Sequence, residues 1–462
     1  MRFLFLLPVL AIAACAPGTT AHNMTERRAN TSAVALPPMK HFALMRGTKP
    51  TRSNREIAND FLELSFKMET GRHLPYMTRF EGPITVRVTG QPPASLGPDL
   101  KQLLNRLRHE ADIPISQVST SQRANITIEA VPRKELQRLV PHAACFVVPH
   151  VSSWSQYRRV LRGKSVSWLT LKKREQITIF LPGDVSPQEV RDCLHEELAQ
   201  ALGPLNDLYR LPDSVFNDDN FHTVLTGFDM LILRAYYAPE MFNGMTRSQA
   251  AVTLPRVLAR LNPDGQGIGG GPLPSPTPRI WIKAIETALG PNSTPTARRK
   301  AANKAVNIAR SRGWNDTRLA FSLYALGRLS LSSKTETALA AFLNSGIIYK
   351  GRQETDIQAA HVSMQLAAFA LTAGDGEATL KLVNSSLGTV IAAQNAALLA
   401  TLLMIKAEAL ELLGRPAEAQ SVRLDSLGWA RYGFGSDNAV RRRLAEIAAL
   451  SPKPETSAKR NL

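Results

Sequence analysis

The stretch RDCLHEELAQALGPLND, residues 191–207, decides how the first half of the chain folds. It follows the alternating, strand-like run EQITIFLPGD, and its own apolar residues recur at the spacing of one helix face. Ser186 predicts the helix start, because Glu189 three residues later completes a capping-box pattern. Gly203 and the proline after it predict its end. The sequence therefore places a long helix directly after a strand.

Both kinds of element recur upstream of this helix. Alternation predicts further strands at 82–90, 124–132, 144–151 and 167–173. Helical spacing predicts helices at 55–69 (capped by Ser53), 96–112, 133–140 and, downstream, 222–237, with His222 as a helix-start residue. We therefore expect an α+β domain over residues 53–261, with a mixed sheet packed against long helices.

The second half of the chain has a different character. Residues 262–278 hold five Gly and five Pro, which predicts a linker without secondary structure. Residues 279–450 contain successive helical segments and no convincing strand. Within them, AEALELLGRPAEAQ resembles the core of a tetratricopeptide repeat, so we expect an all-α, repeat-like domain. It either presents a concave binding face or simply braces the first domain. Residues 451–462 are predicted to be disordered.

The amino terminus predicts the location of the protein. Residues 1–14, MRFLFLLPVLAIAA, have the pattern of a secretory signal and are too short to span a membrane. The ending before Cys15 resembles the lipobox of bacterial lipoproteins, which implies cleavage before Cys15 and its acylation; the alternative is an ordinary signal with a chance cysteine. Ala16 implies the outer membrane, facing the periplasm. Residues 15–52 would then form a lipid-anchored flexible tether.

Length, composition and charge indicate the number of domains and the kind of partner. The chain has 462 residues, which suggests two or three domains, and 44% of them are hydrophobic, enough to build real cores. Its 56 Lys and Arg against 38 Asp and Glu give a net charge of +18, which favours an anionic surface. The basic residues are dispersed without interleaved aromatics, so nucleic acid is not expected. A basic surface that simply faces solvent is the alternative to an anionic surface or an envelope protein as partner.

Two cysteines remain besides Cys15. In an oxidising envelope, Cys145 and Cys193 are expected to form a disulfide, and two buried free thiols are the alternative. Closing a loop of that length would stabilise the fold by about 4 kcal/mol in the chain-entropy model.

The helix can be aligned in two ways with the metal-binding pattern H-E-x-x-H-x-x-G-x-x-H. Starting at His195, the second ligand position falls on Ala199, which cannot bind a metal. Moving the frame by one residue matches more positions. The ligand positions then hold Glu196, Gln200 and Asn206, with Asp207 beside them, Glu197 in the general-base position and Gly203 at the turn.

Oxygen ligands alone do not make a zinc site, because zinc prefers imidazole nitrogen and thiolate sulfur. No cofactor is therefore expected, and the alternative is a harder divalent cation held by Glu196, Gln200, Asn206 and Asp207. Further oxygen donors follow in LPDSVFNDDN, residues 211–220, where Asp213, Asn217, Asp218 and Asp219 are expected to shape a turn rather than bind calcium.

Three segments in order carry a resemblance: CLHEELAQALGPLND, LPDSVFNDDN and FDMLILRAYYAPEMFNGM. Together with RFEGPITVRVTG they resemble a domain of unknown function found in proteobacterial lipoproteins, over roughly residues 50–250. LDSLGWARYGFG is similar to a C-terminal extension of such proteins. The chain departs from the pattern at Tyr236-Tyr237, where Leu-Tyr is common. The resemblance implies a degenerate, zincin-like metallopeptidase fold without an established activity.

Two functions follow as hypotheses. The first is a non-catalytic binding or scaffold protein of the cell envelope, which is no enzyme, and a purely structural tether is its simplest form. The second is a metallopeptidase-like hydrolase of peptides or cell-wall peptides, with Glu197 as general base.

Overall fold

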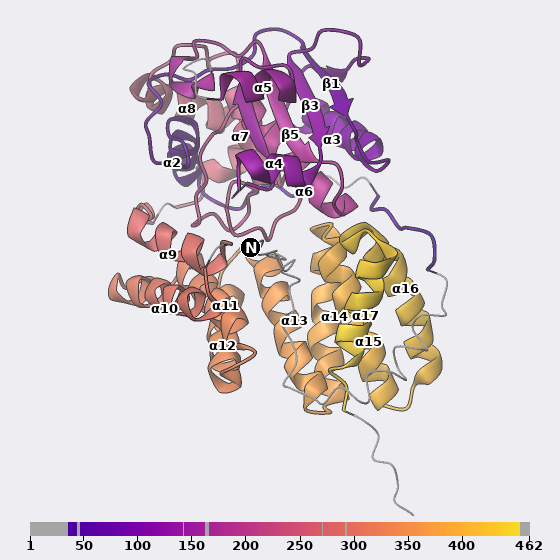
Figure 1. The fold of residues 1–462 in the computed structure, drawn as a ribbon. Coiled ribbons are helices and arrows are strands. Elements are labelled where there is room, and N and C mark those ends of the chain that lie inside the picture. Colours follow the sequence, from indigo (N-terminus) through magenta and orange to yellow (C-terminus); the bar gives the residue numbers. More distant parts are fainter. Residues whose placement is uncertain are drawn as a thin grey trace, which may run out of the picture.

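The computed structural model describes residues 36–43, 47–141, 143–161, 166–269, 271–291 and 293–452. An α/β region comes first, and a region of helices alone follows it (Figure 1). The strands are β1 (Ile84–Gly90), β2 (Ile115–Gln117), β3 (Ile126–Val131), β4 (Phe146–Pro149) and β5 (Ile177–Pro182). The helices of the first region are α2 (Asn54–Ser65), α3 (Leu96–Glu110), α4 (Arg133–Leu139), α5 (Trp154–Val160), α6 (Pro187–Leu202), α7 (Gly227–Tyr236) and α8 (Arg247–Leu261).

The five strands form one mixed sheet in the order β2-β1-β3-β5-β4. Neighbouring strands run parallel except at one edge, where β4 pairs antiparallel with β5 and Phe146 lies opposite Phe180. The expected mixed sheet is confirmed. Because helices alternate with parallel strands along the chain, the region is α/β and not the α+β arrangement predicted from the sequence.

Helices cover both faces of the sheet, and alternate residues of β5 serve the two sides. Ile177, Ile179 and Leu181 join a large core with α2, α3, α6, α7 and α8. Phe180 points into a smaller core with α4 and α5, where its ring lies 5.1 Å from that of Trp154. All six residues of β5 are buried, as expected for a strand with neighbours on both edges and helices on both faces.

Helix α6 begins and ends where the sequence predicts. The Ser186 side chain accepts a hydrogen bond from the backbone N–H of Glu189, and the helix ends at Gly203. Only this half of the capping box is present, because the Glu189 carboxylate pairs instead with Arg133 from the start of α4. A side chain added at Gly203 would lie only 3.0 Å from the ring of Tyr236, so a residue without Cβ fits this close approach.

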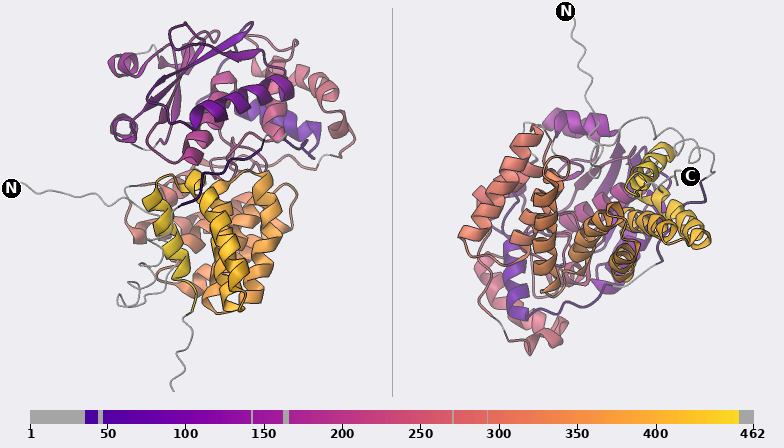
Figure 2. Two further views of the ribbon diagram at one scale, coloured as in Figure 1. Left: turned by 90° about the vertical axis from the view of Figure 1, so that its right-hand side faces the viewer. Right: turned by 90° about the horizontal axis from the view of Figure 1, so that it is seen from below.

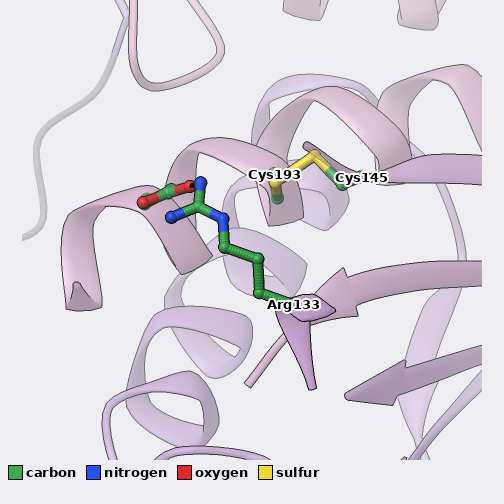
Figure 3. Close-up of a disulfide and its surroundings, with 4 residues drawn as sticks. Arg133, Cys145 and Cys193 are labelled. Atoms are coloured by element: carbon green, nitrogen blue, oxygen red, sulfur yellow. Dashed lines mark hydrogen bonds and ion pairs between the residues drawn. A yellow bond between two sulfur atoms is a disulfide. The ribbon is translucent and has the colours of Figure 1, made fainter. Parts of the chain in front are cut away.

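The predicted disulfide is confirmed. Cys145, just before β4, is bonded to Cys193 in the middle of α6, with 5.9 Å between the Cα atoms. Figure 3 shows the bond between the edge of the sheet and the helix, with Arg133 reaching toward the same helix. The sheet edge and α6 are therefore joined covalently at one point and by an ion pair at another.

Some predicted elements differ from the structure. Residues 167–173 form no strand but a short 3-10 helix, Trp168–Thr170, because Trp168 packs under the guanidinium of Arg174. The helix predicted at 222–237 begins only at Gly227, capped by Thr226. Strand β2 and helix α8 were not predicted from the sequence.

The second region is a row of consecutive helices. They are α9 (Arg279–Leu289), α10 (Pro295–Ser311), α11 (Thr317–Ser330), α12 (Thr335–Lys350), α13 (Asp356–Thr372), α14 (Gly376–Ala392), α15 (Ala396–Leu412), α16 (Pro416–Phe434) and α17 (Asp437–Ala448). Each packs on its neighbours in the chain, and Figure 1 shows the row below the α/β region. An all-helical second region is thus confirmed.

The loop between α6 and α7 joins the two regions. Two of its side chains, Tyr209 and Phe221, belong to the hydrophobic core of the helical region rather than to that of the sheet. The Phe221 ring lies 5.2 Å from Tyr324 of α11 and 4.7 Å from His361 of α13. The Tyr209 ring lies 5.2 Å from Trp281 of α9. The loop of the α/β region thus places two aromatic side chains among helices α9, α11 and α13.

Two segments expected to be free of structure are packed in part. Phe42, in the predicted tether, is buried and stacks on Trp429 of α16 at 4.5 Å. From there the described chain runs along the junction of the two regions, visible in indigo in the left view of Figure 2. In the predicted linker, residues 263–266 form a 3-10 helix that lies against α2 through an Asn54–Asn262 hydrogen bond of 3.0 Å. The predicted signal peptide (1–14), Cys15 and most of the predicted tail lie outside the described residues.

None of the helices in the described ranges is both long and apolar enough to cross a membrane.

Candidate functional site

Helix α6 carries most of the predicted site residues and is enclosed on two sides. One side packs on β4 and β5, and the other meets the helical region. Gln188 donates to Asn395 Oδ1 at 3.1 Å and accepts from the backbone N–H of Ala397 at 2.8 Å. The guanidinium of Arg191 donates to the carbonyl of Gln394 and lies 5.1 Å from the Tyr432 ring. The first turns of α6 are therefore used to hold the two regions together.

His195 has a structural role. It is buried, and its Nδ1 accepts a hydrogen bond of 3.0 Å from the backbone N–H of Leu225. Burial lowers the pKa of His195 well below its ordinary value, and the nearby charges of Arg106 and Arg191 lower it further. The imidazole is thus neutral and holds the segment before α7 against α6.

Glu196, Glu197 and Asp207 are brought together, and two acidic residues that were not part of the predicted site join them. Glu69, which follows α2, and Asp218, in the inserted loop, complete this acidic cluster. Glu69 is close enough to Asp207 to raise the pKa of that carboxyl group. The Tyr209 hydroxyl donates to Asp218.

Burial and repulsion by neighbouring charges shift Glu196, Glu197, Asp207 and Asp218 toward the protonated form. Burial raises the pKa of Glu196 to about 8, and the charges of Asp218 and Glu69 add to the shift. Burial also raises the pKa of Glu197 and of Asp207 well above the ordinary value, with Glu69 contributing to both. For Asp218, burial raises the pKa to about 6 against the opposing effect of the Tyr209 hydroxyl.

Glu197, the predicted general base, is only 4% exposed, and its Oε2 atom has no hydrogen-bond partner among the described residues. A carboxyl group that keeps its proton near neutral pH donates a hydrogen bond but does not remove a proton from water. Burial therefore shifts Glu197, at the general-base position of the sequence pattern, toward its protonated form.

Asn206 and Gln200, the two amide residues of the predicted ligand set, contact different parts of the domain. The side chain of Asn206 donates to the carbonyl of Glu63 in α2 at 3.0 Å. Gln200 is buried, and its backbone carbonyl accepts from Arg174 at 2.6 Å. Over the described ranges, no group of three or more His, Cys, Asp and Glu side chains is placed to hold a metal ion.

In the loop that follows, polar side chains stabilise turns, as the sequence predicts. The Asp219 carboxylate accepts from the backbone N–H of Phe221 at 3.1 Å and from the Asn217 amide at 2.8 Å. Asp213 pairs with Arg52 across the junction. His222 starts no helix, contrary to the prediction; it lies in the loop with Nε2 2.9 Å from the carbonyl of Pro212.

A comparison with known protein families matches this first region. Residues 54–256 match the family described as Protein of unknown function, DUF2927. The match runs from α2 into α8, so it covers the sheet, α6 and the inserted loop, and it confirms the expected domain of unknown function. Neither the curated proteins nor the solved structures give a match.

Arg174 in the DUF2927 domain was not predicted from the sequence. Its guanidinium is buried and donates to the carbonyls of Gln200 and Ala201 at 2.6 Å each, and to that of Gly203. It also donates to Thr78 at 2.9 Å. The carbonyls of Gln200 and Ala201 belong to the last turn of α6, where no partner within the helix is available. The helix dipole also favours a positive charge at this end. No local pattern around Arg174 signals this contact, since its partners lie far along the chain.

Two clefts lie at the junction of the DUF2927 domain and the helices. One, of about 720 Å³, is lined by residues that include Arg52, Asp60 and Arg210. The other, of about 650 Å³, is lined by residues that include Arg106, His222 and Glu354. Neither is lined by Glu196 or Glu197, so the acidic cluster does not open into them.

The raised pKa of Glu196 predicts a dependence of stability on pH. The unfolded chain loses this proton near its ordinary pKa of about 4.3, whereas the folded chain keeps it up to about pH 8. The free energy of unfolding should therefore fall as pH rises between these values, by up to about 1.4 kcal/mol per pH unit for one group. Glu196→Gln should flatten this slope and be more stable than the wild type at the alkaline end.

Urea denaturation at several pH values across this range measures the effect. Glu135→Gln is the matched control, because Glu135 is exposed on α4 and should leave the profile unchanged. Identical slopes for wild type and Glu196→Gln would contradict the assignment.

Proposed function

We propose that the protein is a lipid-anchored cell-envelope protein that acts as a non-catalytic binding or scaffold protein. In this proposal the DUF2927 domain is a degenerate metallopeptidase-like domain whose helix α6 has become a structural element. The observation that carries it is that polar residues of α6 form structural hydrogen bonds. Gln188 and Arg191 bind the helical region, and His195 binds the segment before α7.

The occupied interior of the helical region supports a scaffold role. Tetratricopeptide-like stacks present a surface of alternate helices to a ligand, and the equivalent helices here are α9, α11 and α13. Tyr209 and Phe221 of the DUF2927 domain already fill the space between their aromatic side chains. A partner of the intact protein therefore binds elsewhere on its surface.

The alternative is a hydrolase of peptides or cell-wall peptides, with Glu197 as general base and Glu196, Gln200, Asn206 and Asp207 holding a metal or water. The raised pKa values of Glu196 and Glu197 count against it, because both groups hold their protons near neutral pH. The hydrogen bond from Asn206 to Glu63 also turns one of the four ligands toward α2.

Metal analysis of protein purified from the envelope distinguishes the two functions. The scaffold proposal predicts no stoichiometric metal, because the His195 imidazole on α6 accepts a hydrogen bond from Leu225 and Cys193 is in the disulfide. Glu197→Gln should also support envelope integrity in a strain lacking the protein, as the wild type does. Stoichiometric metal that is lost in Glu196→Ala would refute the proposal in favour of the hydrolase.

The proposed location rests on Cys15 and on the signal before it, which lie outside the described residues. Acylation of Cys15 would tether the chain to the outer membrane, facing the periplasm. After a high-salt wash, Cys15→Ser should release the protein from the membrane fraction into the soluble periplasmic fraction, as seen by immunoblot. Ala16→Ser keeps the cysteine and is the control. Membrane retention of Cys15→Ser at low and at high salt would count against the lipid anchor.

A further inference from the structure

Helix α10 is the most one-sidedly charged element of the helical region. Residues 295–312, which contain the helix and its last turn, hold six basic residues and no acidic one. These are Arg298, Arg299, Lys300, Lys304, Arg310 and Arg312. A cluster of this kind needs a reason, because like charges on one helix repel one another.

Two of the six have a structural role. Arg298 donates to the carbonyl of Ala288 at 2.8 Å and so caps the end of α9. Arg299 donates to the Ser333 hydroxyl at 3.0 Å. The other four, Lys300, Lys304, Arg310 and Arg312, are exposed, and within the described part of the chain none of them forms an ion pair.

The helix dipole explains the position of only two of these four cations. Arg310 and Arg312 lie at the carboxyl end of α10, where a cation gains about 0.3 to 1 kcal/mol from the helix dipole. Lys300 and Lys304 lie more than one turn from the carboxyl end of the helix, so the dipole gives these cations no benefit. In contrast, two other cations of the helical region have acidic partners, Arg415 with Glu418 and Arg423 with Glu411.

Helix α12, the next helix but one along the chain, also carries exposed apolar side chains. Arg299 bonds to Ser333 just before α12, and Arg352 just after α12 donates to the carbonyl of Asn315 at 3.0 Å, so both ends of α10 lie near those of α12. Leu343 and Ile347, one turn apart on α12, are 47% and 70% exposed. Exposed lysines with adjacent aliphatic side chains are typical of surfaces that lie against lipid headgroups.

We propose that the exposed residues of α10 and α12 form a docking surface for an anionic phospholipid bilayer. The charge is complementary, because Lys and Arg side chains near an anionic membrane surface are attracted to it. The aliphatic side chains fit the headgroup region, whereas they have no counterpart in a purely ionic contact with an acidic polymer. The proposal rests on these exposed residues and not on the lipid anchor, so it stands or falls separately from the acylation of Cys15.

Vesicle flotation tests the proposal on the full chain carrying Cys15→Ser, in which no acyl group contributes. The protein should float with phosphatidylcholine vesicles that contain about 30% phosphatidylglycerol, and not with phosphatidylcholine alone. Raising the salt from about 50 mM to about 500 mM should weaken the association, because screening shortens the range of the charges.

A charge-matched pair of variants locates the surface. Lys300→Gln, Lys304→Gln, Arg310→Gln and Arg312→Gln together should weaken binding at least about tenfold. The control removes four exposed cations of the DUF2927 domain, through Lys101→Gln, Arg123→Gln, Lys134→Gln and Lys172→Gln, and should bind nearly as the parent does. Thermal denaturation checks that both variants are folded.

Two results would overturn the proposal. One is equal loss of binding in the two variants, which would assign the effect to net charge. The other is no flotation of the parent with the anionic vesicles, as expected if the cations face solvent or an acidic protein. Neither result bears on the anchor, which the Cys15→Ser fractionation tests by itself.

Discussion

The insertion of Tyr209 and Phe221 between the helices of the second region is the contact on which the rest of the structure depends. Both rings come from the DUF2927 domain, yet they are part of the other region's hydrophobic core. Truncating a buried aromatic side chain to Ala typically costs about 3 to 5 kcal/mol. The polar residues around them, such as Asp219 with its bond to the Phe221 backbone, give the loop the shape that delivers the rings.

Helix α6 serves the same junction from its other end. It is bonded to the sheet edge through Cys193, to the helical region through Gln188 and Arg191, and at its carboxyl end to Arg174. Burial raises the pKa of Glu196 and Glu197 near that end, so the loss of their protons lowers the stability of the fold as pH rises. A helix with this many structural partners has little freedom to rearrange around a substrate.

Local sequence patterns predicted most helices and strands, but they could not predict the contacts between distant segments. The cap at Ser186, the stop at Gly203 and the pairing of Cys145 with Cys193 follow from spacing and compartment alone. The strand expected at residues 167–173 is absent because Trp168 stacks on Arg174, a contact that no periodicity encodes. Of the candidate site, the closeness of Glu196 and Asp207 was predicted, but Glu69 and Asp218 arrive from other segments. Phe42 was assigned to a tether for the same reason: its partner, Trp429, is at the other end of the chain.

Scanning calorimetry tests the central claim, that the inserted loop makes the DUF2927 domain and the helical region one cooperative unit. The account predicts a single unfolding transition whose calorimetric and van't Hoff enthalpies agree. It also predicts that Phe221→Ala lowers the midpoint for both regions together. Two separate transitions in the wild type, with only one of them moved by Phe221→Ala, would contradict it.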